Sequence, residues 1–463
     1  MTATFDVVVI GAGPAGENVA GRASDGGLKV AIVEKELVGG ECSYWGCMPS
    51  KALLRPGDVI AAARRVPGAA GAVVGSADPA ATFATRDSFT GNWDDSGQVP
   101  WLEEHGIELV RGTGRLAGER TVEVRNSSGA VQLLRAAKAV VVASGTRAAV
   151  PPIPGLAGVG YWDNRAITAT SVVPRRLIVI GGGTIGCEMA QAFRRLGCDE
   201  VTIVESSDRL LGREEPFAGA DLRSAFESEG IAVMVSQSVS GVSRRDDGSV
   251  AVDLEEGRVV VADEVLVATG RRPATDDLGL ETVGMAPSGF IDVDDEMRAT
   301  AVADGWLYAV GDCNGRSLLT HMGKYQARVC GDVILGRDAT AATGSAAAPR
   351  VTFTDPQVCA VGLTEREAVE VGIRTRSVTY PTGYVAGATV LGSGASGTSK
   401  LVVDEDRRVI VGATFTGASV QELLHSATIA IVGQVPMERL WHAVPSFPTV
   451  SEVWLRLMEA YGL

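Results

Sequence analysis

The sequence lacks the features that mark nucleic-acid-binding and membrane-spanning proteins. Its 42 lysines and arginines are outnumbered by 56 aspartates and glutamates, which gives a net charge of −14. An acidic surface of this kind repels nucleic acid and anionic membranes, so neither is expected as a partner. No apolar run approaches the roughly 20 residues that a helix needs to span a bilayer.

Cysteine is also scarce, with seven residues in a chain of 463. An odd number of cysteines scattered through a large chain does not make the disulfide framework of a small secreted protein. The N-terminal residues show neither a basic stretch nor a cleavage-like site before the apolar segment 5–10, so we expect no secretory signal. We therefore expect a cytoplasmic protein, where a paired cysteine motif is more often catalytic than structural.

What the sequence does contain is enough apolar material for several domains. Hydrophobic residues make up 46% and charged residues 21%, which is typical of a globular protein with a full interior. A chain of this length normally divides into separate domains. The 57 glycines follow no collagen-like period, so they are expected at tight turns and at close approaches of the backbone.

Two glycine motifs each follow an apolar strand and open a helix. They are Gly11, Gly13 and Gly16 after residues 7–10, and Gly181, Gly183 and Gly186 after residues 177–180. This is the dinucleotide-binding fingerprint, in which glycine permits a tight turn, a close approach of the pyrophosphate and close packing of helix on strand. The helix N-terminus then holds the phosphates with its free N–H groups and positive dipole end.

An acidic residue closes the next strand after each motif. Glu34 follows Gly16 by 18 residues and Glu205 follows Gly186 by 19, where a partner for ribose hydroxyls is expected. A carboxylate repels a 2′-phosphate, so Glu205 favours NADH over NADPH at the second motif. Arg209 and Arg213 lie downstream and keep NADPH as the alternative.

Later strands suggest a chain that leaves the first domain and returns to it. Segments 139–147 and 264–273 are apolar strands that end in similar glycine turns, and segment 306–312 delivers Asp312 at a strand end. An Ala/Gly/Ser/Thr-rich stretch at 338–348 is interpreted as a linker, and strands with helices beyond it predict a separate α+β unit. The predicted fold class is α/β, with two Rossmann-like domains and a C-terminal α+β domain.

The segment 39–51 holds the motif with the clearest chemistry. Cys42 and Cys47 are separated by four residues and followed by Pro49, Ser50 and Lys51. With these motifs in this order, the chain resembles the class I pyridine nucleotide–disulfide oxidoreductases, the group of dihydrolipoamide dehydrogenase, glutathione reductase, mercuric reductase and soluble transhydrogenase. The resemblance covers essentially the whole chain.

The resemblance implies four domains and a homodimer whose active site is shared between subunits. The domains are an FAD-binding domain at 1–150, an NAD(P)H-binding domain at 151–272, a central return to the FAD domain at 273–340, and a dimerisation domain at 341–463. It also implies cofactor contacts for FAD and for the nicotinamide nucleotide. For FAD these are Gly11, Gly13, Gly16, Glu34, Lys51, Thr113, Gly114, Ser144, Gly145, Asp312, Leu319 and Thr320, and for the nucleotide Gly181, Gly183, Gly186, Glu205 and Gly270.

By the same resemblance, Cys42 and Cys47 form a redox-active disulfide. Cys47 would supply the thiolate that contacts the flavin, and Cys42 would be the exposed interchange thiol; a helix N-terminus favours such thiolates. Lys51 and Glu188 resemble an ion pair beside the reactive flavin nitrogen, where a cation stabilises negative charge on the reduced ring. The alternative for Glu188 is a helix-dipole carboxylate in the first turn of its helix.

The remaining five cysteines lack the spacing of metal ligands, and no metal site is expected. They are Cys187, Cys198, Cys313, Cys330 and Cys359.

The sequence departs from the family pattern at two places. Phe447 stands where disulfide-reducing members carry a histidine base, although the glutamate that orients this base is present as Glu452. An aromatic hydrocarbon cannot accept a proton, and His442 is a weak alternative base. Thr184 stands where many relatives place a tyrosine that shields the flavin, which predicts a more open nicotinamide pocket.

Three functions stay open at this point. The first is an FAD enzyme that passes electrons from NADH through the Cys42–Cys47 pair to an unidentified small-molecule acceptor, which could be a disulfide. The second is direct reduction of quinones, dyes or metal ions from the flavin, with the cysteines as a redox store or sensor. The third, from another class, is a flavoprotein that serves as a binding subunit of a larger complex.

Overall fold

The computed structural model describes residues 2–255, 257–341 and 347–463, so residues 342–346 of the predicted linker lie outside the described set. The chain divides into two compact units, each assembled from three segments. The first comprises Met1–Pro49, Asp87–Ala149 and Arg271–Ser345, and the second Ser50–Arg86, Val150–Gly270 and Ala346–Leu463. Within the described residues, no helix is long and apolar enough to cross a membrane.

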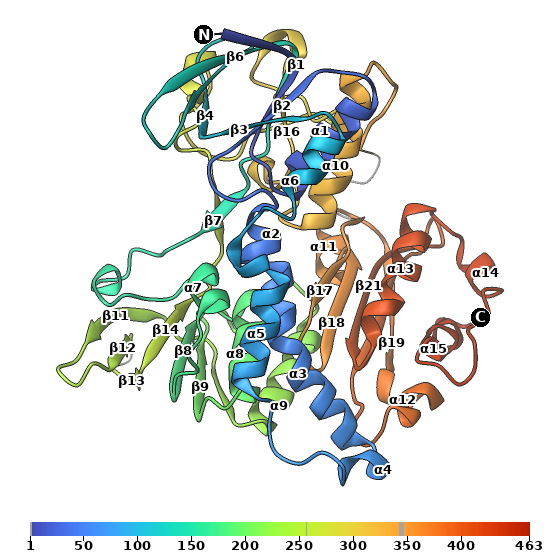
Figure 1. The fold of residues 1–463 in the computed structure, drawn as a ribbon. Coiled ribbons are helices and arrows are strands. Elements are labelled where there is room, and N and C mark those ends of the chain that lie inside the picture. The colour runs from blue at the N-terminus through green and yellow to red at the C-terminus, as the bar shows by residue number, and fades with distance from the viewer. Residues whose placement is uncertain (1, 256, 342–346) are drawn as a thin grey trace. The chain divides into compact units, whose positions relative to one another are not determined.

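The first unit contains a seven-stranded sheet (Figure 1). In spatial order its strands are β3 (Glu108–Arg111), β2 (Val30–Glu34), β1 (Thr2–Ile10), β6 (Val131–Val142), β5 (Thr121–Arg125) and β4 (Thr113–Leu116), and β16 (Leu307–Ala309) also pairs with β6. Strand β1 pairs in parallel with β2 and β6, and its residues from Val7 to Ile10 are buried. Such an uninterrupted apolar run is typical of a parallel strand covered on both faces.

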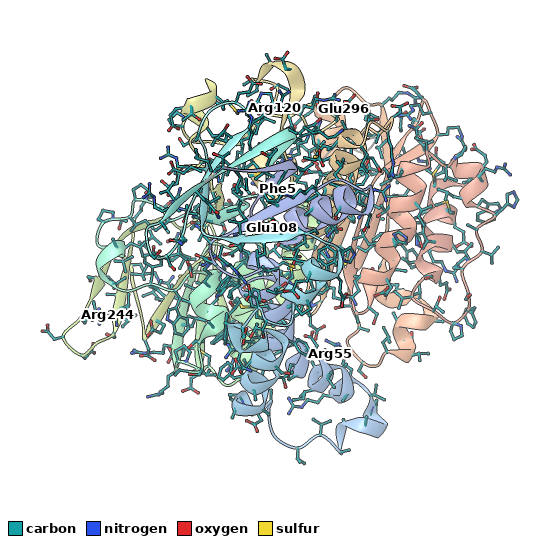
Figure 2. The ribbon with its side chains drawn as sticks, turned by 45° about the horizontal axis from the view of Figure 1, so that its top comes forward. Phe5, Arg55, Glu108, Arg120, Arg244 and Glu296 are labelled. Atoms are coloured by element: carbon teal, nitrogen blue, oxygen red, sulfur yellow. The ribbon has the colours of Figure 1, made fainter. Side chains whose placement is uncertain are left out.

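Helices α1 (Pro14–Asp25) and α10 (Thr320–Ile334) lie side by side in the first unit (Figure 1). Pro14 occupies the first position of α1, where its missing N–H removes no helical hydrogen bond. Phe5 of β1 belongs to the buried core of this unit (Figure 2). The other elements are α2 (Gly40–Tyr44), η1 (Gly91–Trp93), α6 (Val99–Glu104), β7 (Thr146–Ala148), β15 (Arg271–Pro273), η3 (Leu280–Val283), η4 (Ala303–Gly305) and η5 (Gly311–Asn314).

The second unit contains a parallel sheet of four strands. Its order is β10 (Ile231–Met234), β9 (Glu200–Val204), β8 (Arg176–Ile180) and β14 (Glu264–Val267). A separate antiparallel sheet consists of β11 (Val239–Arg244), β12 (Val250–Leu254) and β13 (Val259–Ala262). The helices nearest in sequence are α7 (Asn164–Ala169), α8 (Thr184–Arg195) and α9 (Pro216–Ser228), with η2 (Leu156–Gly158) before them.

Two helices of the chain cross the boundary between the units in sequence. They are α3 (Cys47–Arg65) and α5 (Pro79–Phe89), with the short α4 (Pro67–Ala70) between them.

The C-terminal part of the second unit is built on an antiparallel sheet of five strands. Its order is β17 (Arg350–Thr352), β18 (Gln357–Gly362), β21 (Val409–Gly417), β20 (Thr398–Asp404) and β19 (Thr375–Pro381). Its helices are α11 (Glu365–Glu370), η7 (Thr382–Tyr384), α12 (Ala386–Val390), η8 (Val420–Glu422), α13 (Leu423–Val432), α14 (Met437–Leu440) and α15 (Glu452–Tyr461). The predicted fold class, two nucleotide-binding α/β domains followed by an α+β domain, is therefore confirmed.

Candidate redox and nucleotide-binding sites

The first glycine motif folds into a turn that only glycine allows. Gly11 has φ 105°, and a Cβ there would lie 2.5 Å from the carbonyl oxygen of Ala143. A Cβ on Gly16 would lie 1.9 Å from the carbonyl oxygen of Gly11, so helix α1 could not approach strand β1. By contrast, a Cβ on Gly13, the N-cap residue, would meet only one atom, at 3.9 Å. The N-terminus of α1 is thus open to a phosphate.

Glu34 holds this turn in place from the end of β2. The backbone N–H of Ala12 donates to its Oε2 over 2.8 Å, and the N–H of Glu36 donates to its Oε1 over 2.7 Å. A carboxylate has about four lone-pair positions, so these two bonds leave acceptor capacity for a ribose hydroxyl.

Two further predicted residues present polar atoms in the first unit. The buried hydroxyl oxygen of Ser144 has no hydrogen-bond partner in the described part of the chain. Asp312 accepts a hydrogen bond of 2.7 Å from Thr146, whose hydroxyl also accepts one from Arg271. Burial raises the pKa of Asp312, although Thr146 and Arg271 act in the opposite direction. An orphaned buried hydroxyl is the kind of atom that a bound ligand satisfies.

The other residues predicted to meet FAD lie at element ends of the first unit. Thr113 and Gly114 begin β4, and a Cβ on Gly114 would lie 3.0 Å from Val33. Gly145 has φ 69° and follows Ser144 in the turn after β6. Leu319 is the N-cap of α10 and Thr320 its first residue.

The second glycine motif repeats this geometry in the second unit. Gly181 has φ 111°, a Cβ on it would lie 2.5 Å from Ala268 O, and a Cβ on Gly186 would lie 2.0 Å from Gly181 O. Gly183 is the N-cap of α8, and Gly270 has φ 133° shortly after β14. The segment therefore offers a second open helix N-terminus.

Glu205 closes β9 and accepts backbone hydrogen bonds from Gly182 over 2.6 Å and from Ser207 over 2.7 Å. Burial alone would raise the pKa of Glu205, but these hydrogen bonds outweigh it and the pKa is lowered. The guanidinium of Arg209 donates to Asp208 over 2.9 Å and to the carbonyl of Gly212 over 3.0 Å. The site thus presents the charged carboxylate of Glu205. Arg209, the nearest arginine downstream, is already bound to Asp208 and Gly212.

Cys42 and Cys47 meet where two helices join in sequence. Cys42 lies in α2 and Cys47 is the first residue of α3; no disulfide bond joins them in this structure. A hydrogen bond with the Cys47 side chain raises the pKa of Cys42, as do burial and the charge of Cys47, whereas Thr320 and Lys324 lower it. The Cys47 sulfur lies 3.4 Å from the Thr320 hydroxyl. The sequence predicted Cys42 as the exposed thiol, but Cys47 is exposed and Cys42 partly buried.

Lys51 and Glu188 form an ion pair within the second unit. The Lys51 Nζ and Glu188 Oε2 atoms are 2.8 Å apart, and the backbone N–H of Phe353 donates to Glu188 Oε1 over 2.9 Å. Lys51 Nζ also lies 4.7 Å from the centroid of the Phe353 ring, a cation–π distance. Glu188 itself is 2% exposed.

One sequence expectation about Glu188 is wrong. Helix α8 begins at Thr184, so Glu188 is its fifth residue, and the first turn of α8 contains no acidic residue. The alternative of a first-turn dipole carboxylate is excluded because the dipole effect falls off after that turn. Glu188 is held instead by Lys51 and by the Phe353 backbone.

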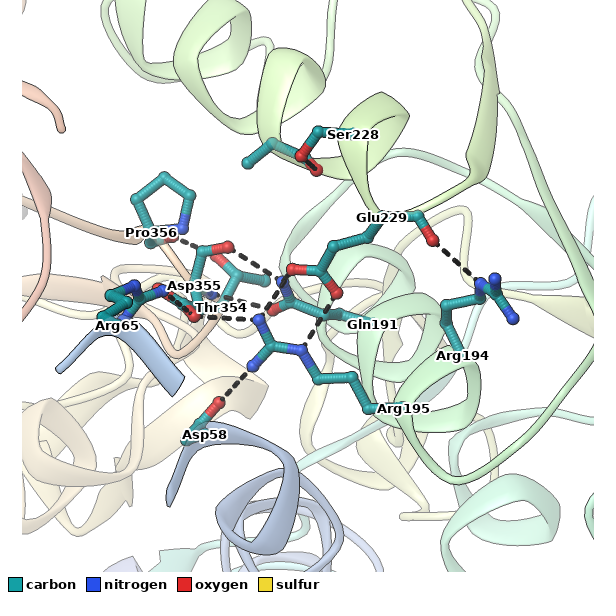
Figure 3. Close-up of polar contacts among 11 residues, drawn as sticks. Asp58, Arg65, Gln191, Arg194, Arg195, Ser228, Glu229, Thr354, Asp355 and Pro356 are labelled. Atoms are coloured by element: carbon teal, nitrogen blue, oxygen red, sulfur yellow. Dashed lines mark hydrogen bonds and ion pairs between the residues drawn. The ribbon is translucent and has the colours of Figure 1, made fainter. Parts of the chain in front are cut away.

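A second polar cluster lies two turns further along the same two helices (Figure 3). Arg195 of α8 donates to Asp58 of α3 over 3.0 Å, to Glu229 over 2.6 Å and to Asp355 over 2.8 Å. Burial raises the pKa of Asp58 to about 6, against the lowering effect of Arg195. Lys51 and Asp58, like Glu188 and Arg195, are seven residues apart and share a helix face. Sequence reasoning missed this clamp, for which the matching spacing was the only signal.

The C-terminal glutamate predicted to orient a base has other partners. Glu452 is buried as the first residue of α15, accepts a hydrogen bond from the N–H of Ala386 over 3.0 Å, and pairs with Arg456 at 2.8 Å. Phe447 is 75% exposed, and His442 is exposed as well. Thr184, also exposed, shares a hydrogen bond of 3.0 Å with Thr352.

The five remaining cysteines are buried and are packing residues. Across residues 2–255, 257–341 and 347–463, no group of three or more histidine, cysteine or acidic side chains could hold a metal ion.

Comparison with known proteins covers the chain from end to end. A family profile described as pyridine nucleotide-disulphide oxidoreductase matches residues 5–327, and the profile of its dimerisation domain matches residues 348–458. A dihydrolipoyl dehydrogenase of Thermus scotoductus is 33% identical over 99% of this chain and 97% of its own length. A mercuric reductase of Staphylococcus aureus is 29% identical over 97% of this chain and 81% of its own length.

Solved structures with lower sequence identity share the fold. LpdA from Mycobacterium tuberculosis superposes with a TM-score of 0.87 at 23% identity and covers 100% of both chains. The HOCl-induced flavoprotein disulfide reductase RclA from Escherichia coli superposes with a TM-score of 0.85 at 24% identity, over 98% of this chain and 99% of its own.

Proposed function

Because this chain belongs to the pyridine nucleotide–disulphide oxidoreductase family and is an FAD-dependent oxidoreductase, we propose that it passes electrons from NADH through FAD to the Cys42–Cys47 pair. From there the electrons reach a small-molecule acceptor. The observation that supports this most directly is the hydrogen bond between the side chains of Cys42 in α2 and Cys47 at the start of α3, where the Thr320 hydroxyl contacts Cys47. Two sulfurs in contact can form and break one disulfide bond.

The first unit fits FAD at both ends of the cofactor. Gly11, Gly13 and Gly16 would admit the pyrophosphate, and Glu34 would hold the adenosine ribose. The Ser144 hydroxyl, which has no partner among the described residues, would lie near the pyrophosphate, and the carboxylate of Asp312 would contact the ribityl chain of FAD. The remaining proposed contacts are Thr113, Gly114, Gly145, Leu319, Thr320 and Lys51. When bound, FAD supplies the two-electron step between nicotinamide and disulfide.

Cys47 is the sulfur that we assign to the flavin side. Cys47 is exposed in this structure, and its sulfur lies 3.4 Å from the hydroxyl of Thr320. Thr320 belongs to the segment that resembles the one under the flavin ring. The N-terminus of α3 stabilises a thiolate at Cys47, because the free N–H groups and helix dipole favour negative charge there. Cys42 is then the thiol that exchanges with an acceptor.

NADH is the proposed electron donor. Gly181, Gly183 and Gly186 would hold its pyrophosphate at the N-terminus of α8, with Gly270 nearby in sequence after β14. Glu205 carries a lowered pKa and so stays ionised, which suits two ribose hydroxyls and opposes a 2′-phosphate.

Lys51 and Glu188 are proposed to set the charge at the reactive flavin nitrogen. A lysine there would stabilise negative charge on the reduced ring. The buried carboxylate of Glu188, fixed by the Phe353 N–H, keeps the lysine in place and charged.

We propose that the domain limits follow those predicted from the sequence: 1–150, 151–272, 273–340 and 341–463. The profile matched at 348–458 describes a dimerisation domain, which supports a homodimer. In the dimer the active site would be shared between subunits, with Glu452 contributed by the dimerisation domain. The Glu452 carboxylate already accepts a hydrogen bond from the Ala386 N–H and pairs with Arg456, so its role in the shared active site would be structural.

A second candidate function is direct reduction of quinones or similar acceptors by the flavin. It is supported by Thr184, whose small, exposed side chain replaces a shielding tyrosine in relatives. Phe447 adds support, because reduction of a disulfide without a histidine base should be slower by roughly 10²–10⁴-fold.

Rapid-mixing reduction by NADH, with the native protein and with Cys42→Ser, separates the two functions. If electrons leave through the cysteines, both proteins show a bleached flavin but only the native protein turns over disulfides. Full turnover of Cys42→Ser with every acceptor in a panel of disulfides, quinones and dyes would leave only the direct route. A flavin that NADH does not bleach would overturn both.

A further inference from the structure

The Arg195 clamp lies on the same two helices as the Lys51–Glu188 pair but has no role in the proposed function (Figure 3). The guanidinium of Arg195 binds three carboxylates from three different segments, those of Asp58, Glu229 and Asp355. The side chain of Arg195 is only 12% exposed. Because desolvation of buried charges offsets much of their attraction, stability alone does not account for this cluster.

Helix α8 holds the chain that follows β17 along one stripe of its surface. Glu188 accepts the N–H of Phe353 over 2.9 Å. Gln191, which is fully buried, bonds to both the N–H and the carbonyl of Asp355, each over 2.8 Å. Arg195 donates to the carboxylate of Asp355, also over 2.8 Å. Intervals of three and four residues place these groups on one face of α8, so α8 and this chain are joined over two turns.

Helix α3 is attached to α8 at two points. Near its start, Lys51 pairs with Glu188 at 2.8 Å, and seven residues later Asp58 accepts a hydrogen bond of 3.0 Å from Arg195. With a rise of 1.5 Å per residue, these two points are about 10 Å apart along α3. A single contact would allow α3 to pivot, whereas two contacts fix its direction against α8.

The backbone of α3 is weakest between these two points. Pro56 lies inside the helix and has no N–H, so the carbonyl of Ala52 loses its helical partner. Gly57 follows, and a Cβ on it would lie 2.7 Å from the Cδ atom of Arg195. The stem of Arg195 therefore packs directly against α3 and supports it just beyond the proline.

We propose that Arg195 is a positioning residue for Lys51. Lysine carries its charge on a flexible stem, so its position depends on its surroundings. The Lys51 Nζ lies 2.8 Å from Glu188 Oε2 and 4.7 Å from the centroid of the Phe353 ring. Arg195 holds α8, which carries Glu188, against both the chain that carries Phe353 and the helix that carries Lys51. The inference rests on the proposed function, in which Lys51 stabilises negative charge on the reduced flavin.

The test is the two-electron midpoint potential of the flavin, measured by anaerobic equilibration with a reference dye. The FAD-loaded protein carries Cys42→Ser and Cys47→Ser, so the flavin takes up all the electrons. In this background Arg195→Met should lower the potential by about 30 mV, which corresponds to a tenfold weaker reduction equilibrium for two electrons. Asp58→Ala, which removes only the contact with α3, should lower it by less. Asp58→Ala carries the test if Arg195→Met does not fold.

The control is another buried cation of the second unit. Lys400 pairs with Glu215 at 2.8 Å and with Glu365 at 2.6 Å, and its side chain is 9% exposed. Lys400→Met breaks a comparable buried network that does not include α3, so the flavin potential should stay unchanged. An equal shift in Lys400→Met would overturn the inference.

A double variant separates positioning from a general structural role. If Arg195 acts through Lys51, adding Arg195→Met to Lys51→Met should cause no further shift in potential. Shifts that add up, or a potential that neither Arg195→Met nor Asp58→Ala changes, would overturn the inference and leave the proposed function intact. A potential that Lys51→Met leaves unchanged would overturn the proposed role of Lys51, and the inference with it.

Discussion

The two glycine motifs of the chain fold almost identically but use their glutamates differently. Gly11 and Gly181 adopt φ 105° and φ 111°, and a Cβ on either would lie 2.5 Å from the carbonyl oxygen of the residue that follows a neighbouring strand. In each motif a strand-end glutamate accepts the N–H that follows the first glycine, over 2.8 Å for Glu34 and 2.6 Å for Glu205. The turn, the helix and the strand-end carboxylate thus form the same structural motif in each unit.

The difference lies in the glutamate that follows the third glycine. In the second unit Glu188 is paired with Lys51 at 2.8 Å and clamped by a backbone N–H. In the first unit Glu17 has no such partner in the described residues, and burial raises its pKa to about 7. The glutamate near the start of the helix is therefore a fixed charge in the second unit, as the fifth residue of α8, and a titratable group in the first, as the fourth residue of α1.

Breaking the fixed pair should have the largest effect. In Lys51→Met, Glu188 is left buried without its cation, and the flavin loses a stabilising charge. We expect reduction by NADH in rapid-mixing experiments to slow by roughly 10²–10³-fold, the range seen when one group that stabilises developing charge is removed. Arg55→Met removes an exposed charge one turn later on α3 (Figure 2) and should reduce at the native rate. Equal rates for Lys51→Met and Arg55→Met would remove Lys51 from the account.

Changing the strand-end glutamates should separate the two nucleotide sites. In Glu205→Gln the charged hydrogen bonds to ribose are lost, at a cost of about 1.5–3 kcal/mol. The ratio of kcat/KM for NADH to that for NADPH should fall about 10–100-fold. In Glu34→Gln that ratio should stay constant while the FAD content of the purified protein falls. The assignment fails if Glu205→Gln leaves the ratio unchanged; Glu200→Gln, at the opposite end of β9, is the control.

Restoring the missing base should give a smaller gain. Phe447→His should raise turnover of small disulfides about 10-fold, below the range of 10²–10⁴ for a well-oriented base. The gain is limited because Glu452, which would orient the histidine, already binds Ala386 and Arg456. Steady-state assays beside His442→Ala provide the comparison. No gain at all would indicate a pocket that is not built for disulfides.

The titratable glutamate should produce the smallest effect, on stability. The pKa of Glu17 rises from 4.5 to about 7 on folding, so the folded state binds the extra proton between these values. The contribution of protonated Glu17 to the free energy of unfolding is therefore fully present below pH 4.5 and is lost as the pH rises through about 7. Glu17→Gln removes this loss, so its melting temperature should rise relative to native at pH 8 and match it at pH 5. A difference that does not change with pH would contradict the shift.

Much of the fold was predictable because its signals are local. The glycine motifs, the apolar strands and the closing glutamates lie within about 25 residues of each other, and each was recognised from spacing alone. The Lys51–Glu188 pair spans 137 residues and was named only through the resemblance. The Arg195 clamp was missed, because tertiary packing brings its charges together and no short motif marks it.

The central claim is that electrons from NADH reach Cys42 and Cys47. Counting thiols tests it most directly: one equivalent of NADH is added to the oxidised, FAD-loaded protein under argon, and new thiols are alkylated and located by mass spectrometry. We expect two new thiols per chain, at Cys42 and Cys47, and none at the five buried cysteines. A flavin that is reduced in full while Cys42 and Cys47 stay unlabelled would contradict it.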